Sequence, residues 1–144
     1  MENNISEEEQ RKYFIMNWSE MDTQLICEVP VFCRSVDLVK YNKLKNTVSA
    51  IEFKTKNWKR AVEQVMSTAI SFDYVEICIR KPKTKKAQDT IIEYCSKMGI
   101  GVYFFLVNDF KFEHAVLPQK VDTIWNVQKC QVIDFIMKGE TYAR

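Results

Sequence analysis

Two acidic residues and one lysine are spaced along the chain as a metal-binding catalytic site requires. Asp37 lies in a stretch with strand character, Glu52 follows fifteen residues later in the next such stretch, and Lys54 stands two positions beyond it. Residues two apart on a strand project from the same face, so Glu52 and Lys54 share a face. A hairpin register that sets Asp37 opposite Glu52 brings two carboxylates and one ammonium group onto one patch. Such a patch suits Mg²⁺, a hard cation that prefers oxygen ligands and retains several waters.

A metal held on this patch supports attack of water on a phosphodiester. The cation lowers the pKa of a bound water and neutralises charge on the pentacovalent phosphate. Lys54 then orients the water or contacts the phosphate, and Gln64 on the following helix reaches the same patch. The alternative for Glu52 and Lys54 is a solvated strand face with a cross-strand ion pair, which contributes little to stability. For Gln64 the alternative is an exposed helix residue.

The first half of the chain is predicted to form one helix and three strands. Ser6 followed by three glutamates is typical of a helix start, and the helix is expected over about residues 6–21. Short polar links indicate an antiparallel meander, and Pro30 places the first strand at an edge or a bulge. The predicted strands cover residues 25–32, 36–41 and 48–55.

The second half alternates helices and strands. Asn57 is suited to cap the first of these helices, and Gly99 ends the second. The expected elements are a helix over 58–70, a strand over 73–79, a helix over 83–98, a strand over 101–107, a weaker edge strand over 110–117 and a closing helix over about 121–138. This order predicts one α/β domain over residues 1–144.

The composition is that of an ordinary globular protein, with 144 residues, 47% hydrophobic and 28% charged. The net charge of +2 does not by itself predict nucleic-acid binding, but residues 54–60 and 80–86 hold nine of the 21 basic side chains and no acid. The first run flanks the proposed site, and Trp58 in it is suited either to stack on a base or to face the core. The second run is more typical of a solvated helix start. The candidates for holding a phosphate backbone are Arg34, Lys56, Trp58, Lys59 and Arg60.

The five cysteines form no CxxC pair, which indicates buried free thiols in a reducing compartment. No apolar run approaches the roughly 18 residues needed to span a bilayer, and the N-terminal stretch is acidic, unlike a signal peptide. These features predict a cytoplasmic protein with no membrane partner. The single histidine, His114, has no nearby Cys or Ser and is expected to be structural or incidental.

The acid, the Glu-x-Lys triplet and the helix glutamine, in this order, resemble the PD-(D/E)XK nuclease superfamily. The chain looks most like small single-domain members, MmcB-like and otherwise uncharacterised, over about residues 25–107. The resemblance implies a restriction-endonuclease-like fold, a three-layer α-β-α sandwich with an αβββαβ core and a mixed sheet, here with an extra C-terminal helix. The matching stretches are Glu28-Val29-Pro30-Val31, Arg34-Ser35-Val36-Asp37-Leu38-Val39, Ala50-Ile51-Glu52-Phe53-Lys54 and Trp58-Lys59-Arg60-Ala61-Val62-Glu63-Gln64.

Carried over by position, the resemblance implies a role for each candidate. Asp37 and Glu52 become the Mg²⁺ ligands, with Mn²⁺ as a possible substitute, and the Phe53 carbonyl completes the site. Lys54 becomes the catalytic lysine. The resemblance also implies Glu28 as an auxiliary acid near the metal and Gln64 as a supporting residue. Two departures stand out: Val36 replaces the proline of the family name, and Thr68 stands where one large, helicase-linked branch has tyrosine.

The function expected from these residues is that of a Mg²⁺-dependent DNA endonuclease in repair, restriction or mobile-element defence, with RNA still open as a substrate. The alternative is an inactive nuclease-fold module that binds nucleic acid or another protein. The closing helix offers more apolar surface than one stripe needs, which indicates a homodimer or partner contact. Its apolar residues are Ile124, Trp125, Val127, Val132, Phe135 and Ile136.

Overall fold

Six strands form one sheet whose spatial order follows the chain. The structure, a computed structural model, describes residues 4–142, with side chains described up to residue 139. The strands are β1 (Thr23–Val31), β2 (Arg34–Asn42), β3 (Thr47–Lys54), β4 (Tyr74–Arg80), β5 (Gly101–Leu106) and β6 (Lys111–Val116). The helices are α1 (Glu7–Asn17), α2 (Trp58–Ser67), the short 3-10 helix η1 (Ala69–Ser71), α3 (Lys85–Met98) and α4 (Asn126–Tyr142).

The lengths of the connections set the strand directions. Short turns join β1 to β2, β2 to β3 and β5 to β6, and these three pairs are antiparallel. Helical crossovers join β3 to β4 and β4 to β5, and both pairs are parallel. A parallel pair needs a crossover of a dozen or more residues, whereas a tight turn permits only an antiparallel one. The predicted meander, the mixed sheet and the edge position of the strand containing Pro30 are confirmed.

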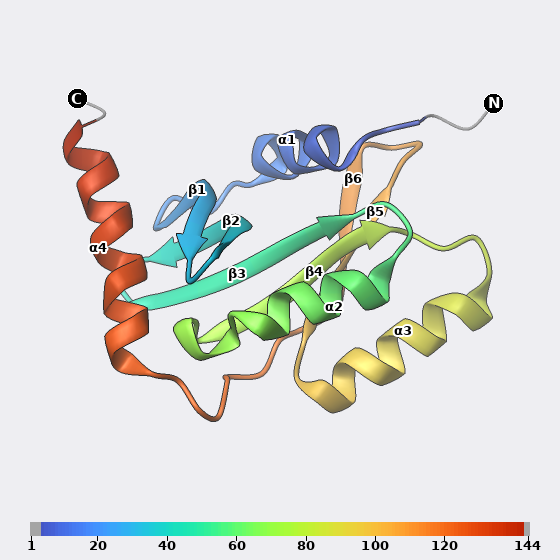
Figure 1. Cartoon of the computed structure of the whole chain (residues 1–144). Helices are drawn as coiled ribbons and strands as arrows, with labels where there is room; N and C mark the ends of the chain where they lie inside the picture. The colour runs from blue at the N-terminus through green and yellow to red at the C-terminus, as the bar shows by residue number, and fades with distance from the viewer. Residues whose placement is uncertain (1–3, 143–144) are drawn as a thin grey trace.

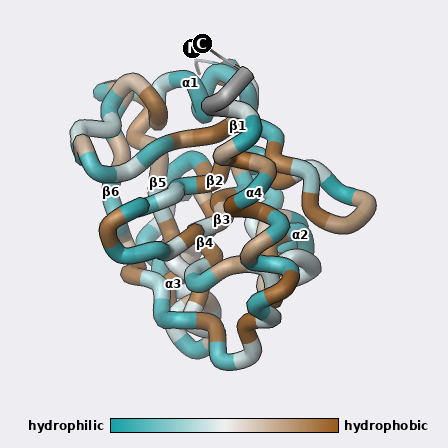
Figure 2. The backbone as a smooth tube through the Cα atoms, turned by 90° about the vertical axis from the view of Figure 1, so that its left-hand side faces the viewer, coloured by the Kyte–Doolittle hydropathy of each residue, from teal (hydrophilic) through white to brown (hydrophobic). Residues whose placement is uncertain are grey.

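Helices cover both faces of the sheet. Figure 1 shows α1 on one face and α2 and α3 on the other, with α4 beside the β1 end. The larger core cluster lies under α2 and α3, and a smaller one, centred on Phe14 of α1, packs against Ile51 and Phe53. In the hydropathy-coloured view of Figure 2 the helices alternate teal and brown segments, as expected for helices that bury one side.

Local signals begin and end the helices where the sequence predicts. Ser6 and Glu9 form a reciprocal capping box at the start of α1, and the Asn57 side chain accepts the Arg60 N–H at 3.1 Å at the start of α2. Gly99, with φ of 74°, ends α3 in the left-handed conformation that favours glycine. The ends of the outer helices differ from expectation.

The first and last helices are shorter at one end than predicted, because backbone groups there have other partners. α1 stops at Asn17 instead of about residue 21, since Trp18 is extended. α4 starts at Asn126 instead of about residue 121, because the N–H groups of Val121 and Trp125 donate to the carbonyl oxygens of Asp73 and Ile70. Residues 121–125 therefore connect the sheet to α4.

An ion pair seats α4 against the body of the protein. Lys129 Nζ lies 3.0 Å from a carboxylate oxygen of the buried Asp73, which also accepts the Val48 N–H at 2.8 Å. Val132 and Ile136 of α4 are buried, whereas Phe135 of α4 is 42% exposed and Trp125, just before the helix, is 54% exposed. The apolar residues of this helix therefore serve partly as core and partly as surface.

The prediction of buried thiols is right for two cysteines and wrong for three. Cys78 and Cys95 are buried and free. Cys27, Cys33 and Cys130 are free and exposed, because they lie on the edge strand β1, in the turn after it and on the outer side of α4. Among the described helices, none is both long and apolar enough to cross a bilayer.

Candidate metal centre and its surroundings

The end of the β2–β3 hairpin brings the two predicted carboxylates together. Paired residues in this hairpin run from Asn42 with Thr47 to Leu38 with Ile51, so the next step of the register sets Asp37 opposite Glu52. The regular ladder stops at this point. Asp37 Oδ2 instead accepts the backbone N–H of Phe53 at 2.8 Å. The side chain of Asp37 thus takes over a ladder position beside Glu52, which fixes its carboxylate against β3.

Glu52 is a buried carboxyl beside a second carboxyl. Glu52 lies under α2 and is only 5% exposed. Burial, followed by the charge and hydrogen bonding of Asp37, raises the pKa of Glu52 from its ordinary value to about 9, against a weaker opposing effect of Lys54. Two neighbouring carboxylates in a poorly solvated place cannot both ionise cheaply unless a cation joins them. A cation bound between Asp37 and Glu52 therefore stabilises the state in which both are ionised.

A small pocket opens onto this pair. Its volume is about 230 Å³, and it holds Lys54 from the end of β3 and Gln64 from α2 together with the two carboxylates. The four predicted residues therefore line the same pocket, as their spacing in the sequence indicated. The complete lining is Arg34, Ser35, Asp37, Glu52, Lys54, Gln64 and Thr68. Ser35 and Thr68 were not predicted as site residues, because isolated hydroxyl residues give no recognisable pattern.

Glu28 does not line the pocket that holds Glu52. Its side chain is 66% exposed and pairs with Arg11 of α1 at 3.2 Å. It lines a separate hollow of about 250 Å³ with Asp37 and Phe53, on the side of α1. Its φ of 54° turns the backbone of β1 locally out of strand geometry. Glu28 is thus a neighbour of Asp37 and lies outside the pocket that holds Glu52.

Helix α1 contributes charged residues that the sequence did not reveal as part of this region. Arg11 donates to the Asp37 carbonyl oxygen at 3.4 Å as well as to Glu28, and Glu7 lies 3.7 Å from Lys54 Nζ. Glu7 and Glu8 line the same hollow as Glu28. In the sequence these glutamates read only as first-turn acids of a capped helix. Their proximity to the site depends on how α1 crosses the sheet.

Side chains supply only part of the ligand shell that a hard divalent cation needs here. Within residues 4–139, no group of three or more His, Cys, Asp and Glu side chains is placed to hold a metal. Asp37 and Glu52 make a two-carboxylate set, and their mutual repulsion is the property that a bound cation relieves. Mg²⁺ commonly takes one or two carboxylates and keeps several waters. The residues therefore fit Mg²⁺ or Mn²⁺ whose other ligands are mostly waters. The Phe53 carbonyl oxygen stays a predicted further ligand.

The predicted basic contacts separate into two places. Arg34 lines the carboxylate pocket, and the exposed Arg60 pairs with Glu63 at 3.1 Å. Lys56 and Lys59 line a different and larger cavity between α2 and α3. Trp58 is half-buried there and packs against the core, with its ring edge-on to Tyr94 at 5.4 Å, whereas stacking on a base stays a prediction.

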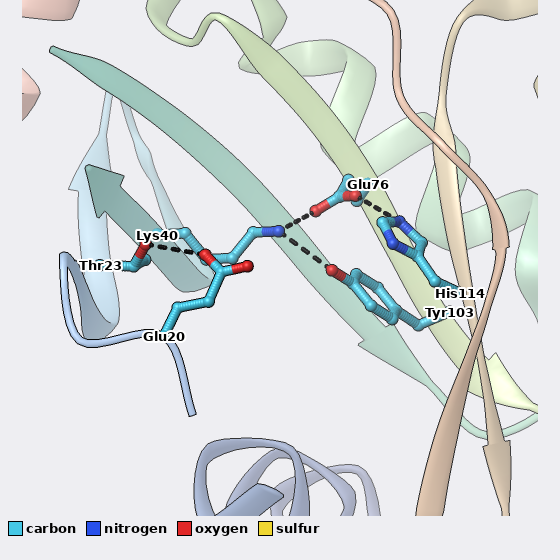
Figure 3. Close-up of polar contacts among 6 residues, drawn as sticks. All are labelled: Glu20, Thr23, Lys40, Glu76, Tyr103 and His114. Carbon is cyan, nitrogen blue, oxygen red and sulfur yellow. Dashed lines mark hydrogen bonds and ion pairs between the residues drawn. The ribbon is translucent and has the colours of Figure 1, made fainter. Parts of the chain in front are cut away.

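A second polar cluster lies on the α1 face of the sheet. Glu76 is fully buried, 2.6 Å from Lys40 Nζ and 3.0 Å from His114 Nε2, while Lys40 also contacts the Tyr103 hydroxyl at 3.1 Å. Figure 3 shows Lys40 reaching between Glu76 and Tyr103, with His114 stacked on Tyr103. Burial opposes ionisation of Glu76, but its contacts with His114 and Lys40 lower its pKa below the ordinary value. The cluster is a paired, structural one, and His114 has a structural partner as expected.

Comparison with known proteins yields one structural likeness. No protein-family model matches the chain, and no curated protein sequence does either. Among solved structures, the SPO1766 protein of unknown function from Silicibacter pomeroyi is similar, with a TM-score of 0.69 and 10% identity over 99% of this chain and 90% of that one. A likeness at this identity concerns the fold alone.

Proposed function

We propose that this protein is a Mg²⁺-dependent phosphodiesterase that cleaves DNA as an endonuclease. The observation that carries the proposal is the pair of adjacent carboxylates, Asp37 and buried Glu52, in a pocket that also holds Lys54 and Gln64. Carboxylates that repel each other unless a cation is present, with an ammonium group and an amide at hand, match the needs of metal-assisted phosphate hydrolysis.

Each residue has a distinct task in the proposed reaction. Asp37 and Glu52 hold the metal, which supplies a water of lowered pKa and neutralises charge on the phosphate. The Phe53 N–H holds the Asp37 carboxylate in position. Lys54 donates to the attacking water or to a phosphate oxygen, and leaves its contact with Glu7 to do so. Gln64 orients substrate from α2, and Arg34 at the pocket rim binds the neighbouring phosphate.

The element order supports the finer fold assignment that accompanies this function. The run α1-β1-β2-β3-α2-β4 matches the αβββαβ core of restriction-endonuclease-like proteins, with α3, β5, β6 and α4 added. We therefore assign the chain to that fold as part of the proposal. A cytoplasmic role in DNA repair, restriction or mobile-element defence is its natural context, and RNA is a further substrate to assay.

Cleavage assays with matched variants test the proposal. Plasmid, linear, single-stranded and branched DNA, and a structured RNA, are incubated with the protein and Mg²⁺ or Mn²⁺. Product should require the metal and should fall at least about a hundredfold in Asp37→Ala and in Lys54→Ala, by analogy with the loss of other groups that stabilise a transition state. Asp89→Ala and Lys97→Ala, which alter the same residue types on the exposed side of α3, serve as controls.

Circular dichroism establishes that every variant is folded. Product that persists in folded Asp37→Ala refutes the assigned site. Absence of product from the unmodified protein on all five substrates with both metals refutes the activity.

The second candidate is a nuclease-fold module that binds nucleic acid without cleaving it. Lys54 faces Glu7 at 3.7 Å and Glu28 is paired with Arg11, so two of the predicted site residues already have partners outside the pocket. This candidate predicts salt-sensitive DNA binding that is the same with EDTA or Mg²⁺ and the same in Asp37→Ala.

A further inference from the structure

A second cavity lies apart from the carboxylate pocket, between the first turns of α2 and α3. It has a volume of about 760 Å³ and is bounded by the segments that leave the carboxyl ends of β3 and β4. Because β3 and β4 are parallel, their carboxyl ends and the starts of α2 and α3 meet at one edge of the sheet, as Figure 1 shows. The cavity shares no lining residue with the carboxylate pocket.

Positive charge dominates this cavity. None of the lining residues that the structure describes is acidic, and the basic ones are Lys56, Lys59, Arg80, Lys81, Lys83 and Lys86. One of these, Lys81, pairs with Glu113 at 2.8 Å. The first turns of α2 and α3 carry no acid, in contrast to α1, so the positive ends of both helix dipoles add to the field. An anion between the two helices relieves this repulsion.

The walls of the cavity are apolar, and the cavity is larger than a phosphate ion needs. Buried Ile79 and Ile91 form its floor, and Trp58, Pro82 and Ala87 form flat or small apolar surfaces beside it. Pockets of this size hold ligands of drug-like dimensions, with apolar walls for the organic part and a few polar groups for orientation. A flat heteroaromatic group attached to a phosphate satisfies both the walls and the charge.

We propose that this basic cavity, whose lining residues come from the segments 55–59 and 79–91, binds a nucleoside phosphate. The phosphate lies on Arg80, Lys86 and the start of α3, and the base packs against Trp58 and Pro82. The ligand is a free nucleotide or the phosphorylated terminal nucleotide of a nucleic-acid strand, since both present the same group. The inference does not depend on metal-dependent cleavage at Asp37 and Glu52.

Titration of the full chain with defined ligands tests this assignment. Isothermal calorimetry in EDTA compares AMP, ATP, inorganic phosphate, adenosine, and a short single-stranded oligonucleotide with a 5′-phosphate or a 5′-hydroxyl. Binding of a nucleotide or of the 5′-phosphorylated oligonucleotide, at least about tenfold tighter than inorganic phosphate and adenosine, is the expected result. A preference for the phosphorylated strand assigns the strand end as the ligand, and a preference for the mononucleotide assigns the free nucleotide. Binding of inorganic phosphate as tight as that of any nucleotide overturns the proposal.

A charge-matched pair of variants locates the binding. Arg80→Gln/Lys86→Gln should weaken nucleotide binding at least about tenfold, because each lost charge-assisted hydrogen bond is strong. Lys12→Gln/Lys120→Gln removes the same charge from exposed positions outside the cavity and should leave affinity unchanged. Equal losses in both doubles overturn the site.

A measurement on the unmodified protein does not rely on the variants folding. Amide shifts on adding AMP, or the phosphorylated strand, should concentrate in residues 55–59 and 80–87. Shifts centred on residues 34–37 and 52–54, or no binding at all, refute the cavity as the nucleotide site.

Discussion

Replacing Lys40 by methionine should cost far more stability than the same change at a surface lysine. Lys40 is 13% exposed and lies 2.6 Å from Glu76, which has no exposure at all. Methionine keeps much of the apolar stem but leaves the Glu76 carboxylate with only the imidazole of His114 as a polar partner. Breaking a buried pair by removing one partner costs about 3–5 kcal/mol. We expect about 3 kcal/mol here because His114 remains, which is a large share of the roughly 5–15 kcal/mol that stabilises a domain.

Lys97→Met is the matched control. Lys97 pairs with Glu93 at 3.2 Å on the surface of α3, where both side chains are at least 70% exposed. Exposed pairs contribute about 0–1 kcal/mol, so this variant should be close to the unmodified protein. Urea denaturation at pH 7, followed by circular dichroism, measures both free energies of unfolding. The double variant Lys40→Met/Glu76→Gln should recover part of the loss, because no buried charge is then left unpaired.

The effect of Lys40→Met should also depend on pH. The pKa of Glu76 is lowered in the folded protein, so its ionisation contributes stability above its unfolded pKa of about 4.5, and this is lost as the pH falls. Loss of Lys40 raises that pKa, since burial then meets less opposition. The difference between variant and unmodified protein should therefore shrink below about pH 4.5. A Lys40→Met effect under about 0.5 kcal/mol at pH 7, equal to that of Lys97→Met, would mean that the buried Lys40–Glu76 pair contributes no more than a surface pair.

Three further outcomes are expected. In the metal-free protein the raised pKa of Glu52 makes stability fall as pH rises from about 4.5 to about 9. Glu52→Gln should therefore flatten the dependence of the urea midpoint on pH, and Mg²⁺ should stabilise the protein more at pH 9 than at pH 6. A urea midpoint that does not change with pH in the unmodified protein contradicts this. Lys129→Met leaves buried Asp73 without its cation, and should cost about 3 kcal/mol and speed amide exchange in α4; unchanged exchange argues against that ion pair as the seat of α4. Gly101→Ala places a Cβ 2.6 Å from a buried carboxylate oxygen and should cost about 1–3 kcal/mol by urea denaturation, whereas Gly139→Ala, with open space around it, should be neutral or stabilising; equal effects refute the clash.

Much of the architecture could be predicted because its signals are local. The capping residues Ser6 and Asn57, the glycine at 99 and the short turns are read within a few positions of the chain, and they set where most elements begin and end. The hairpin register that brings Asp37 to Glu52 also follows from a four-residue turn. The predicted helix ends that were wrong, at residues 18 and 121–125, depend on distant carbonyl partners or on an extended backbone that no local pattern indicates.

The candidate site was predicted in part for the same reason. Glu52, Lys54 and Gln64 follow from strand alternation and helix spacing, so their convergence is a local consequence. Glu28 is on the neighbouring strand by sequence, yet its positive φ and its pairing with Arg11 direct it elsewhere. The contributions of Glu7 and Arg11 depend on the crossing of α1 over the sheet, which the helix sequence does not contain.

The order of helices and strands, the antiparallel meander and the strand that carries the Glu-x-Lys triplet can be read from the chain alone, because periodicity, capping and loop length act over short stretches. Which charges are paired and which are desolvated depends instead on tertiary packing. Glu76 lies in an apolar strand pattern, and its partners Lys40 and His114 come from 36 and 38 positions away in the chain. The raised pKa of Glu52 and the basic cavity between α2 and α3 likewise arise from packing that excludes water and gathers charges from distant segments.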